Sequence, residues 1–193
     1  MDTQHLLDNT VVIITSDHGE AFGEHEFWQH EHTLYGEVLR VPLYVKRARQ
    51  ERGEVSHQRL NGADVYYLAF RELGLEVEDA PHDGAVIAEW YRSAERAASD
   101  KRWPVDIDRD LVAWIDGTVK WIVGSKGTVE AYDLATDPQE LHNLAVSREQ
   151  IERAQARAAS WWAAHPPLAA QKQPGRELDP SVRERLRNLG YLE

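Results

Sequence analysis

The first hydrophobic segment of the chain is Val11-Val12-Ile13-Ile14-Thr15. A continuous β-branched run without alternation is typical of a strand buried on both faces, usually inside a parallel sheet. Such a strand needs neighbours, and the nearby candidates are residues 40–45 and 85–89. Because these strands are too few for a doubly wound sheet, we expect the chain to begin in the middle of a domain.

The next periodic segment predicts a helix. Apolar residues repeat at helical spacing over Val65–Leu73, with Asn61 or Gly62 available as the cap and Gly74 at the C-terminal end. We expect this helix to cover one face of the sheet.

Three short strand candidates follow at residues 110–116, 118–124 and 129–134. Asp116-Gly117 is a strong signal for a two-residue hairpin, and Ser125-Lys126-Gly127 is a plausible second turn. Strands joined by tight turns form an antiparallel meander rather than a βαβ unit. The pattern therefore predicts a domain boundary near residues 76–84, which gives two parts, 1–75 and 76–193.

The C-terminal third predicts two helices. Ser147 and Gln150 are spaced as in a capping box, which opens a helix that extends to about residue 164. His165-Pro166-Pro167 ends it, and a shorter helix is expected from Ser181 to Gly190.

Composition excludes several classes of protein. The net charge of −11 argues against broad nucleic-acid binding, because phosphates would be repelled. No apolar run approaches the roughly 18–20 residues that a membrane span needs. There is no cysteine among the 193 residues, which excludes disulfides, thiolate metal sites and a cysteine nucleophile.

Asp17 and His18 are the first candidates for chemistry, since only Ser16 separates them from the apolar run and Gly19 allows a sharp turn. In open α/β sheets, ligands bind beyond the carboxyl ends of strands. A carboxylate with an imidazole suits Zn²⁺, Mn²⁺ or Fe, whereas Ca²⁺ and Mg²⁺ prefer oxygen ligands. Alternatively, Asp17 caps a helix and His18 is only packed, but the position after a buried strand favours a metal site.

A histidine-rich segment follows, with His25, His30 and His32 within eight residues. These side chains could hold a metal, bind an anion as imidazolium ions, or donate a proton to a leaving group. A solvent-exposed polar loop explains the same spacing equally well, so spacing alone selects none of the three histidines.

Several segments together resemble a known family. They are Thr15–Glu20, Gly23–His25, His30–Tyr35, Glu37–Leu43, Gly117–Ile122, Ala131–Pro138 with Glu140 and Asn143–Ala145, and Leu186–Leu192. This combination closely resembles the sulfatase family of the alkaline-phosphatase superfamily, over almost the whole chain. The resemblance implies an α/β fold: the C-terminal portion of an alkaline-phosphatase-like mixed-sheet domain plus a small subdomain of antiparallel sheet and helices.

The resemblance also implies a site. Asp17 matches an aspartate ligand of the active-site divalent cation, commonly Ca²⁺, with Mn²⁺, Mg²⁺ or Zn²⁺ as alternatives. His18 stands where sulfatases place an Asn, Gln or His near the metal. His30 falls where many members have a sulfate-contacting lysine, so it would contact the sulfate ester or protonate the leaving oxygen.

One family feature is missing from this sequence. Sulfatases carry their nucleophile, a cysteine or serine oxidised to formylglycine, in a Cys/Ser-x-Pro-x-Arg motif near the N-terminus, together with two metal-binding aspartates. Neither is present, so we predict the C-terminal part of a sulfatase-like hydrolase, inactive alone. The alternatives are a phosphodiesterase or phosphonate hydrolase of the same superfamily, and a non-catalytic fragment or subunit that pairs with a separate N-terminal sulfatase chain.

Overall fold

The computed structural model describes residues 5–78, 86–92, 109–166 and residue 184. By internal contacts the chain divides into two compact units, residues 1–163 and 164–193, and the account below concerns the first. The helix predicted from Ser181 to Gly190 lies outside the described residues except at position 184. No helix in the described part is long and apolar enough to cross a membrane.

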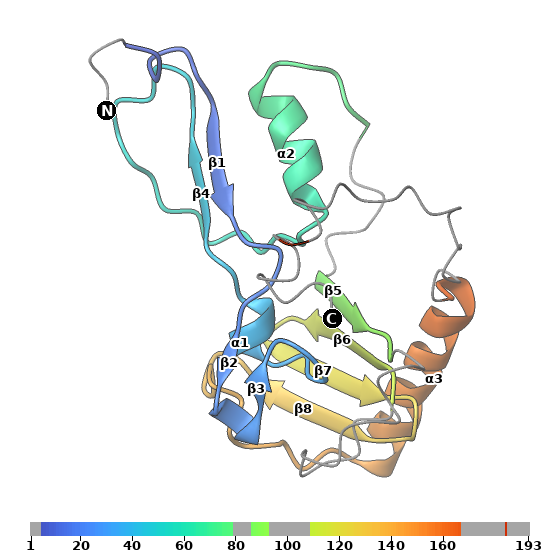
Figure 1. Cartoon of the computed structure of the whole chain (residues 1–193). Helices are drawn as coiled ribbons and strands as arrows, with labels where there is room; N and C mark the ends of the chain where they lie inside the picture. Colours follow the sequence, from blue (N-terminus) through green and yellow to red (C-terminus); the bar gives the residue numbers. More distant parts are fainter. Residues whose placement is uncertain (1–4, 79–85, 93–108, 167–183, 185–193) are drawn as a thin grey trace. The chain divides into compact units, whose positions relative to one another are not determined.

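The first unit contains three small sheets and three α-helices among its described residues (Figure 1). The elements in chain order are β1 (Val12–Thr15), β2 (Ala21–Phe22), the 3₁₀ turn Glu24–Glu26, β3 (Trp28–Gln29), α1 (Gly36–Leu39), β4 (Leu43–Lys46), α2 (Asp64–Glu72), β5 (Val86–Trp90), β6 (Leu111–Asp116), β7 (Val119–Gly124), β8 (Val129–Asp133) and α3 (Arg148–Ala164).

The predicted meander is confirmed as an antiparallel sheet in the order β5-β6-β7-β8. Asp116 pairs with Val119, so Gly117 and Thr118 form a two-residue turn, and Gly117 has the positive φ of 60° that glycine tolerates best. Gly127 takes a φ of 90° in the turn between β7 and β8.

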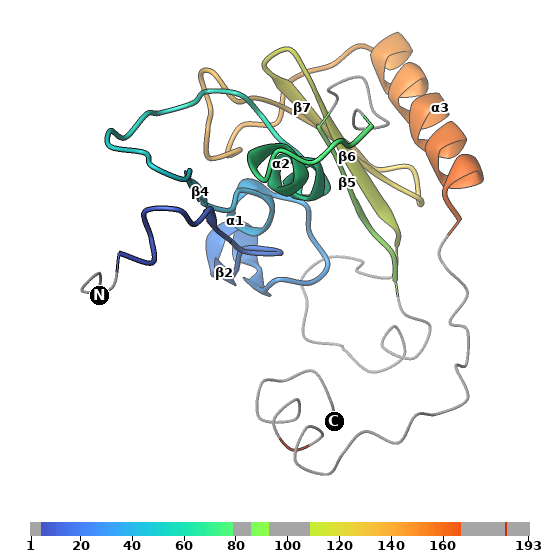
Figure 2. The same cartoon turned by 90° about the horizontal axis from the view of Figure 1, so that it is seen from above.

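Each face of this sheet is covered. One face packs on α3, as Figure 2 shows, and the other packs on Leu34 and the neighbouring α1 segment. Side chains alternate between the faces of a strand, so β6 is apolar at successive positions because both of its faces are buried. The α3-side cluster contains Val112, Trp114, Val123, Ala154 and Ala158, and the opposite cluster contains Leu34, Leu111, Ala113, Ile122 and Tyr132.

The predicted start of α3 is also confirmed. The Ser147 hydroxyl accepts a hydrogen bond from the Gln150 backbone N–H at 3.2 Å. The Gln150 side chain in turn accepts one from the Ser147 N–H at 2.8 Å. This reciprocal pair is the capping box that the sequence spacing predicts.

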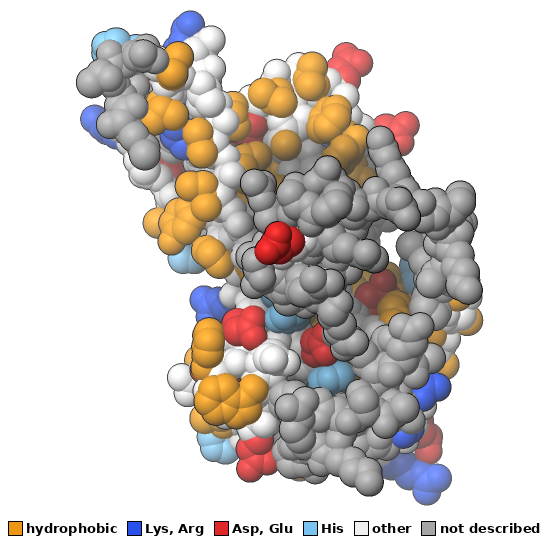
Figure 3. Space-filling model, in the orientation of Figure 1, with side chains coloured by type: hydrophobic (Ala, Val, Ile, Leu, Met, Phe, Trp, Pro, Cys, Tyr) orange, Lys and Arg blue, Asp and Glu red, His pale blue; other side chains and the backbone are white. Residues whose placement is uncertain are grey.

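The predicted environment of the first strand is wrong within the described residues. β1 pairs antiparallel with β4 in a two-stranded sheet, and its third and fourth residues are exposed. Ile14 is 59% exposed and Tyr44 on β4 is 67% exposed. Figure 3 shows hydrophobic side chains on the surface of this part of the chain. Among the described residues, this apolar run therefore has the composition of an interior strand but pairs with one strand, β4.

Two further expectations are corrected. Residues 85–89 were expected to neighbour the first strand, but β5 pairs with β6 in the four-stranded sheet. Asn61 or Gly62 was expected to cap α2, but the residue at the N-cap position is Ala63. The Asn61 side chain accepts a hydrogen bond from the Ile87 N–H at 3.1 Å and so ties that loop to β5. No residue of α2 is fully buried, and the expectation that this helix covers a sheet face remains a prediction. The division into 1–75 and 76–193 remains a prediction.

Candidate active site

The chain leaves β1 through a sharp turn that holds Asp17 and His18 together. The Ser16 hydroxyl donates to the His18 carbonyl at 2.7 Å, and Asp17 Oδ1 accepts from the His18 N–H at 3.1 Å. The backbone N–H of Asp17 itself, and then the neighbouring His18, lower the pKa of the Asp17 carboxyl. Asp17 is therefore a carboxylate at neutral pH. Its Oδ2 lies 3.8 Å from His18 Nε2, so the two side chains point to one region.

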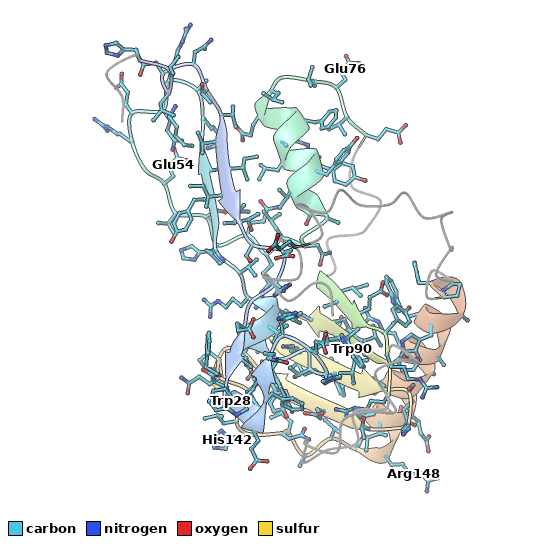
Figure 4. All side chains as sticks on the ribbon, viewed as in Figure 1. Trp28, Glu54, Glu76, Trp90, His142 and Arg148 are labelled. Carbon is cyan, nitrogen blue, oxygen red and sulfur yellow. The ribbon has the colours of Figure 1, made fainter. Side chains whose placement is uncertain are left out.

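The β2–β3 hairpin brings Glu20 and His30 together. Ala21 pairs with Gln29 across the hairpin, and Glu20 and His30 flank that pair at its open end. His30 Nδ1 lies 3.1 Å from Glu20 Oε2. Trp28 pairs with Phe22 nearer the turn, and Figure 4 marks its position on the hairpin.

These two elements meet at the histidines. The rings of His18 and His30 stack with centroids 4.0 Å apart. His18, Glu20 and His30 each offer a ligand atom, and the three atoms lie within 4.8 Å of one another. Two imidazoles and a carboxylate in this spacing could hold a divalent cation of the transition series.

The other two histidines of the segment lie elsewhere. His25 is mostly buried, stacks on Tyr35 with centroids 3.8 Å apart, and lies 2.9 Å from Glu37 Oε1. His32 is 8% exposed, with its ring against Trp90 on β5. Of the three candidates, His30 is thus the one beside His18. The role that the sequence assigns to His30 remains a prediction.

The histidine-rich segment has an unusual backbone. Four of its non-glycine residues have positive φ: His25 at 50°, Glu26 at 65°, Gln29 at 72° and His32 at 70°. Each such residue costs on the order of 1 kcal/mol, and such conformations persist only where the surroundings fix them. Left-handed residues gather at functional sites more often than elsewhere, which is consistent with a site here.

A buried polar network lies behind the segment. His25 Nδ1 faces the Glu37 carboxylate, and its Nε2 faces the Glu140 carbonyl at 3.0 Å. Both partners are acceptors, so the ring satisfies both when it is doubly protonated. Burial lowers the pKa of His25, but hydrogen bonds to Glu140 and Glu37 outweigh it, and the net pKa is raised.

This raised pKa predicts a pH-dependent stability. Because folded His25 binds its proton more tightly than the unfolded chain, its contribution is complete below the unfolded pKa of about 6.5. We expect the free energy of unfolding to fall as pH rises through the higher folded pKa. Glu37, Glu140, Tyr35 and, behind Glu140, Lys120 are the ionisable groups that surround the ring.

Urea unfolding across pH 6 to 9 measures this dependence, with His25→Gln as the comparison. The variant should be less stable at pH 6, and its free energy of unfolding should change less with pH than that of the original chain. If the free energy of unfolding changes equally with pH in the two proteins, the protonated state of His25 is contradicted.

No role was predicted from the sequence for Glu20, Glu37, Lys120 or Glu140. Glu20 could have been found from its position two residues after His18. The buried pair of Lys120 on β7 and Glu140 gives no local signal, because its partners are twenty residues apart and look like ordinary surface charges.

Comparison with known proteins supports the resemblance to the sulfatase family. The Sulfatase family model matches residues 1–74. An uncharacterized sulfatase, YidJ of Escherichia coli, is 26% identical over 148 residues, which cover 74% of this chain and 29% of that protein. The resemblance to the sulfatase family is therefore confirmed, and the chain spans about a third of the length of the relatives it matches.

Solved structures show the same fold. A putative sulfatase from Bacteroides thetaiotaomicron has a TM-score of 0.61 at 19% identity, covering 81% of this chain and 37% of that one. The phosphonate monoester hydrolase of Agrobacterium radiobacter has a TM-score of 0.52 at 20% identity, covering 81% and 35%. The expected alkaline-phosphatase-like α/β class is confirmed.

Proposed function

We propose that this chain is the C-terminal part of a sulfatase-like sulfuric ester hydrolase. Asp17 and His18 hold a divalent cation, and His30, oriented by Glu20, acts on the sulfate ester. The cation would polarise the sulfuryl oxygens, and His30 would stabilise charge or protonate the leaving oxygen. The nucleophile is not among these residues, so the chain alone is expected to give no turnover of an aryl sulfate.

The observation that supports this proposal best is the orientation of His18. Its Nδ1 lies 2.8 Å from the Gly19 carbonyl, which can only accept, so Nδ1 donates and Nε2 is the ring nitrogen left to bind a cation. Metal-bound histidines usually donate their second nitrogen to a carbonyl or carboxylate in this way. This nitrogen, Nε2, lies 3.8 Å from Asp17 Oδ2, a separation that one cation can bridge.

His30 is also held through its Nδ1, but by a carboxylate instead of a backbone carbonyl. Its Nδ1 lies against the Glu20 carboxylate, which leaves Nε2 for a proton transfer or for the cation. Exposure of about 41% of the His30 side chain leaves it accessible to a substrate.

Ca²⁺ is the cation that the family resemblance implies. The imidazole in the donor set suits Mn²⁺ or Zn²⁺ better than Ca²⁺ or Mg²⁺, which prefer oxygen ligands. We therefore include all four ions as candidates and use Mn²⁺ as the main probe.

Calorimetric titration of the purified chain with Mn²⁺ tests the proposal. We expect one saturable site whose affinity falls more than about tenfold in His18→Ala, since losing only an outer-shell partner already costs about 10–100-fold. His30→Ala should retain binding if His30 acts on the ester and lose it if His30 is a third ligand. His142→Ala is the matched control, because His142 is 84% exposed and outside the site. Equal affinity in His18→Ala and the original chain would contradict the cation site.

A second enzyme class is a phosphonate or phosphate ester hydrolase. The fold shared with the phosphonate monoester hydrolase of Agrobacterium radiobacter favours it, as does the Asp-His pair, which suits a transition metal. The nucleophile that completes the site distinguishes the two classes, so joining this chain to a segment that supplies it and comparing aryl sulfate with aryl phosphonate decides between them.

A third possibility is that a separate N-terminal sulfatase chain binds this one. The exposed apolar residues of β1 and β4, including Ile14 and Tyr44, favour a partner, since an uncovered apolar strand pair promotes association. Size-exclusion chromatography is the test: a stable, well-folded monomer at high concentration would argue against a required partner.

A further inference from the structure

Glu140 connects three separate segments from the loop after β8. Its side chain is 1% exposed, and its backbone takes a positive φ of 59°. Its Oε1 pairs with Lys120 Nζ on β7 at 2.5 Å, and its Oε2 accepts from the Gly36 N–H at 2.5 Å. Its carbonyl accepts from His25 Nε2 at 3.0 Å.

The contact with Gly36 leads to the turn that carries the proposed cation ligands. Gly36 is the first residue of α1, and the Val38 carbonyl of the same helix accepts from the Gly19 N–H at 2.7 Å. A Cβ placed on Gly19 would lie 2.0 Å from the Glu37 carbonyl oxygen, so the two backbones are in direct contact. The position of α1 therefore fixes the turn that holds His18 and Glu20.

The contact with His25 leads to His30, the residue proposed to act on the ester. His25 lies in the 3₁₀ turn that joins β2 and β3, and its ring is held between Glu37 and Tyr35. The same hairpin carries Glu20 and His30 at its open end. Glu140 thus contacts the supports of both histidines at the site.

The energy of the Lys120–Glu140 pair favours a positioning role. Taking two charges out of water costs several kcal/mol per ion, and hydrophobic residues of similar volume would often stabilise a fold equally well. Burial lowers the pKa of Lys120, and the Glu140 carboxylate opposes that change. Buried polar groups of this kind can instead select one arrangement of the segments around them.

We propose that Glu140, held by Lys120, is a positioning residue for the cation site, so that the C-terminal sheet sets the geometry of ligands from the N-terminal part of the chain. The proposal rests on the proposed function, because it takes Asp17 and His18 as the ligands. Neither residue of the buried pair touches the cation or the ester.

Glu140→Gln tests the proposal, since glutamine keeps the shape and the acceptor for Gly36 but removes the charge beside Lys120. We expect the Mn²⁺ dissociation constant to rise about tenfold, the lower end of the range for outer-shell changes. In the metal-free protein, the ring resonances of His18 and His30 should shift in NMR spectra, because the two rings no longer stack in one arrangement.

Val123→Ala is the matched control. Val123 is buried in the cluster on the α3 side of the sheet, so the substitution costs stability without touching Glu140 or its partners. It should leave the Mn²⁺ dissociation constant and both histidine signals unchanged. If Glu140→Gln does not fold, Gly36→Ala replaces it, because its Cβ would lie 3.2 Å from Glu140 Oε2 and displace the contact slightly.

The outcomes separate the two proposals. Unchanged affinity and unchanged histidine signals in Glu140→Gln overturn the positioning role, as do equal changes in Val123→Ala. If the original chain does not bind Mn²⁺, or binds it equally well in His18→Ala, the cation site is wrong. The metal-free histidine signals still decide whether Glu140 positions those rings.

Discussion

Gly19→Ala should destabilise the chain by roughly 3 kcal/mol, near the upper end of the usual range for overpacking. The added methyl group would lie 2.0 Å from the Glu37 carbonyl oxygen and 3.0 Å from its carbon. Both atoms are backbone, so no side-chain rotation relieves the clash. The strand end or α1 must move, which breaks the hydrogen bond from Gly19 to Val38. Urea unfolding measures the loss.

Gly53→Ala is the control for this substitution. A Cβ at Gly53 meets no atom within 4 Å, so the change should alter the free energy of unfolding by less than about 0.5 kcal/mol. Equal stability of Gly19→Ala and Gly53→Ala would show that α1 does not lie against residue 19.

Lys120→Met should have an equally large effect. The substitution leaves the buried Glu140 carboxylate without its cation, and breaking a buried pair from one side typically costs about 3–5 kcal/mol. The free energy of unfolding from urea titration is the measurement. Methionine fills most of the space of the lysine stem, so lost packing accounts for little of the change.

Arg148→Met provides the comparison at the surface. Arg148 pairs with Glu152 on α3 at 2.8 Å, but its side chain is 91% exposed, so the pair contributes at most about 0.5 kcal/mol. A loss below 1 kcal/mol in Lys120→Met would mean that the Lys120–Glu140 pair is not buried and ion-paired as described.

The sequence was most informative where contacts are local. The β6–β7 turn at Gly117 and the Ser147–Gln150 cap were predicted because a few adjacent residues determine them. The order of β6, β7 and β8 followed from the same short connections. Residue types at the end of β1 also led to Asp17 and His18 as candidate ligands, since strand ends are where ligand-binding side chains gather, and their role remains a prediction.

The pattern of hydrophobic and polar residues did not predict contacts between residues far apart in the chain. The apolar run of β1 indicates a strand but not which strands bury it, and β5 was assigned to the wrong neighbour for this reason. The choice of His30 among three histidines came from family resemblance, because spacing gives no information on ring stacking with His18. The Lys120–Glu140 pair depends on packing that no local window contains.

The bond between Gly36 and Glu140 joins residues 104 positions apart, whereas the β6–β7 turn joins near neighbours. Each doubling of a closed loop adds about 0.6 kcal/mol of chain entropy that later contacts must offset. Hairpins of the meander can therefore form early in folding, and α1 can dock only onto a sheet that already exists. His18 and His30, at the open end of the β2–β3 hairpin, would then reach their final arrangement last, after the sheet and α1 have assembled.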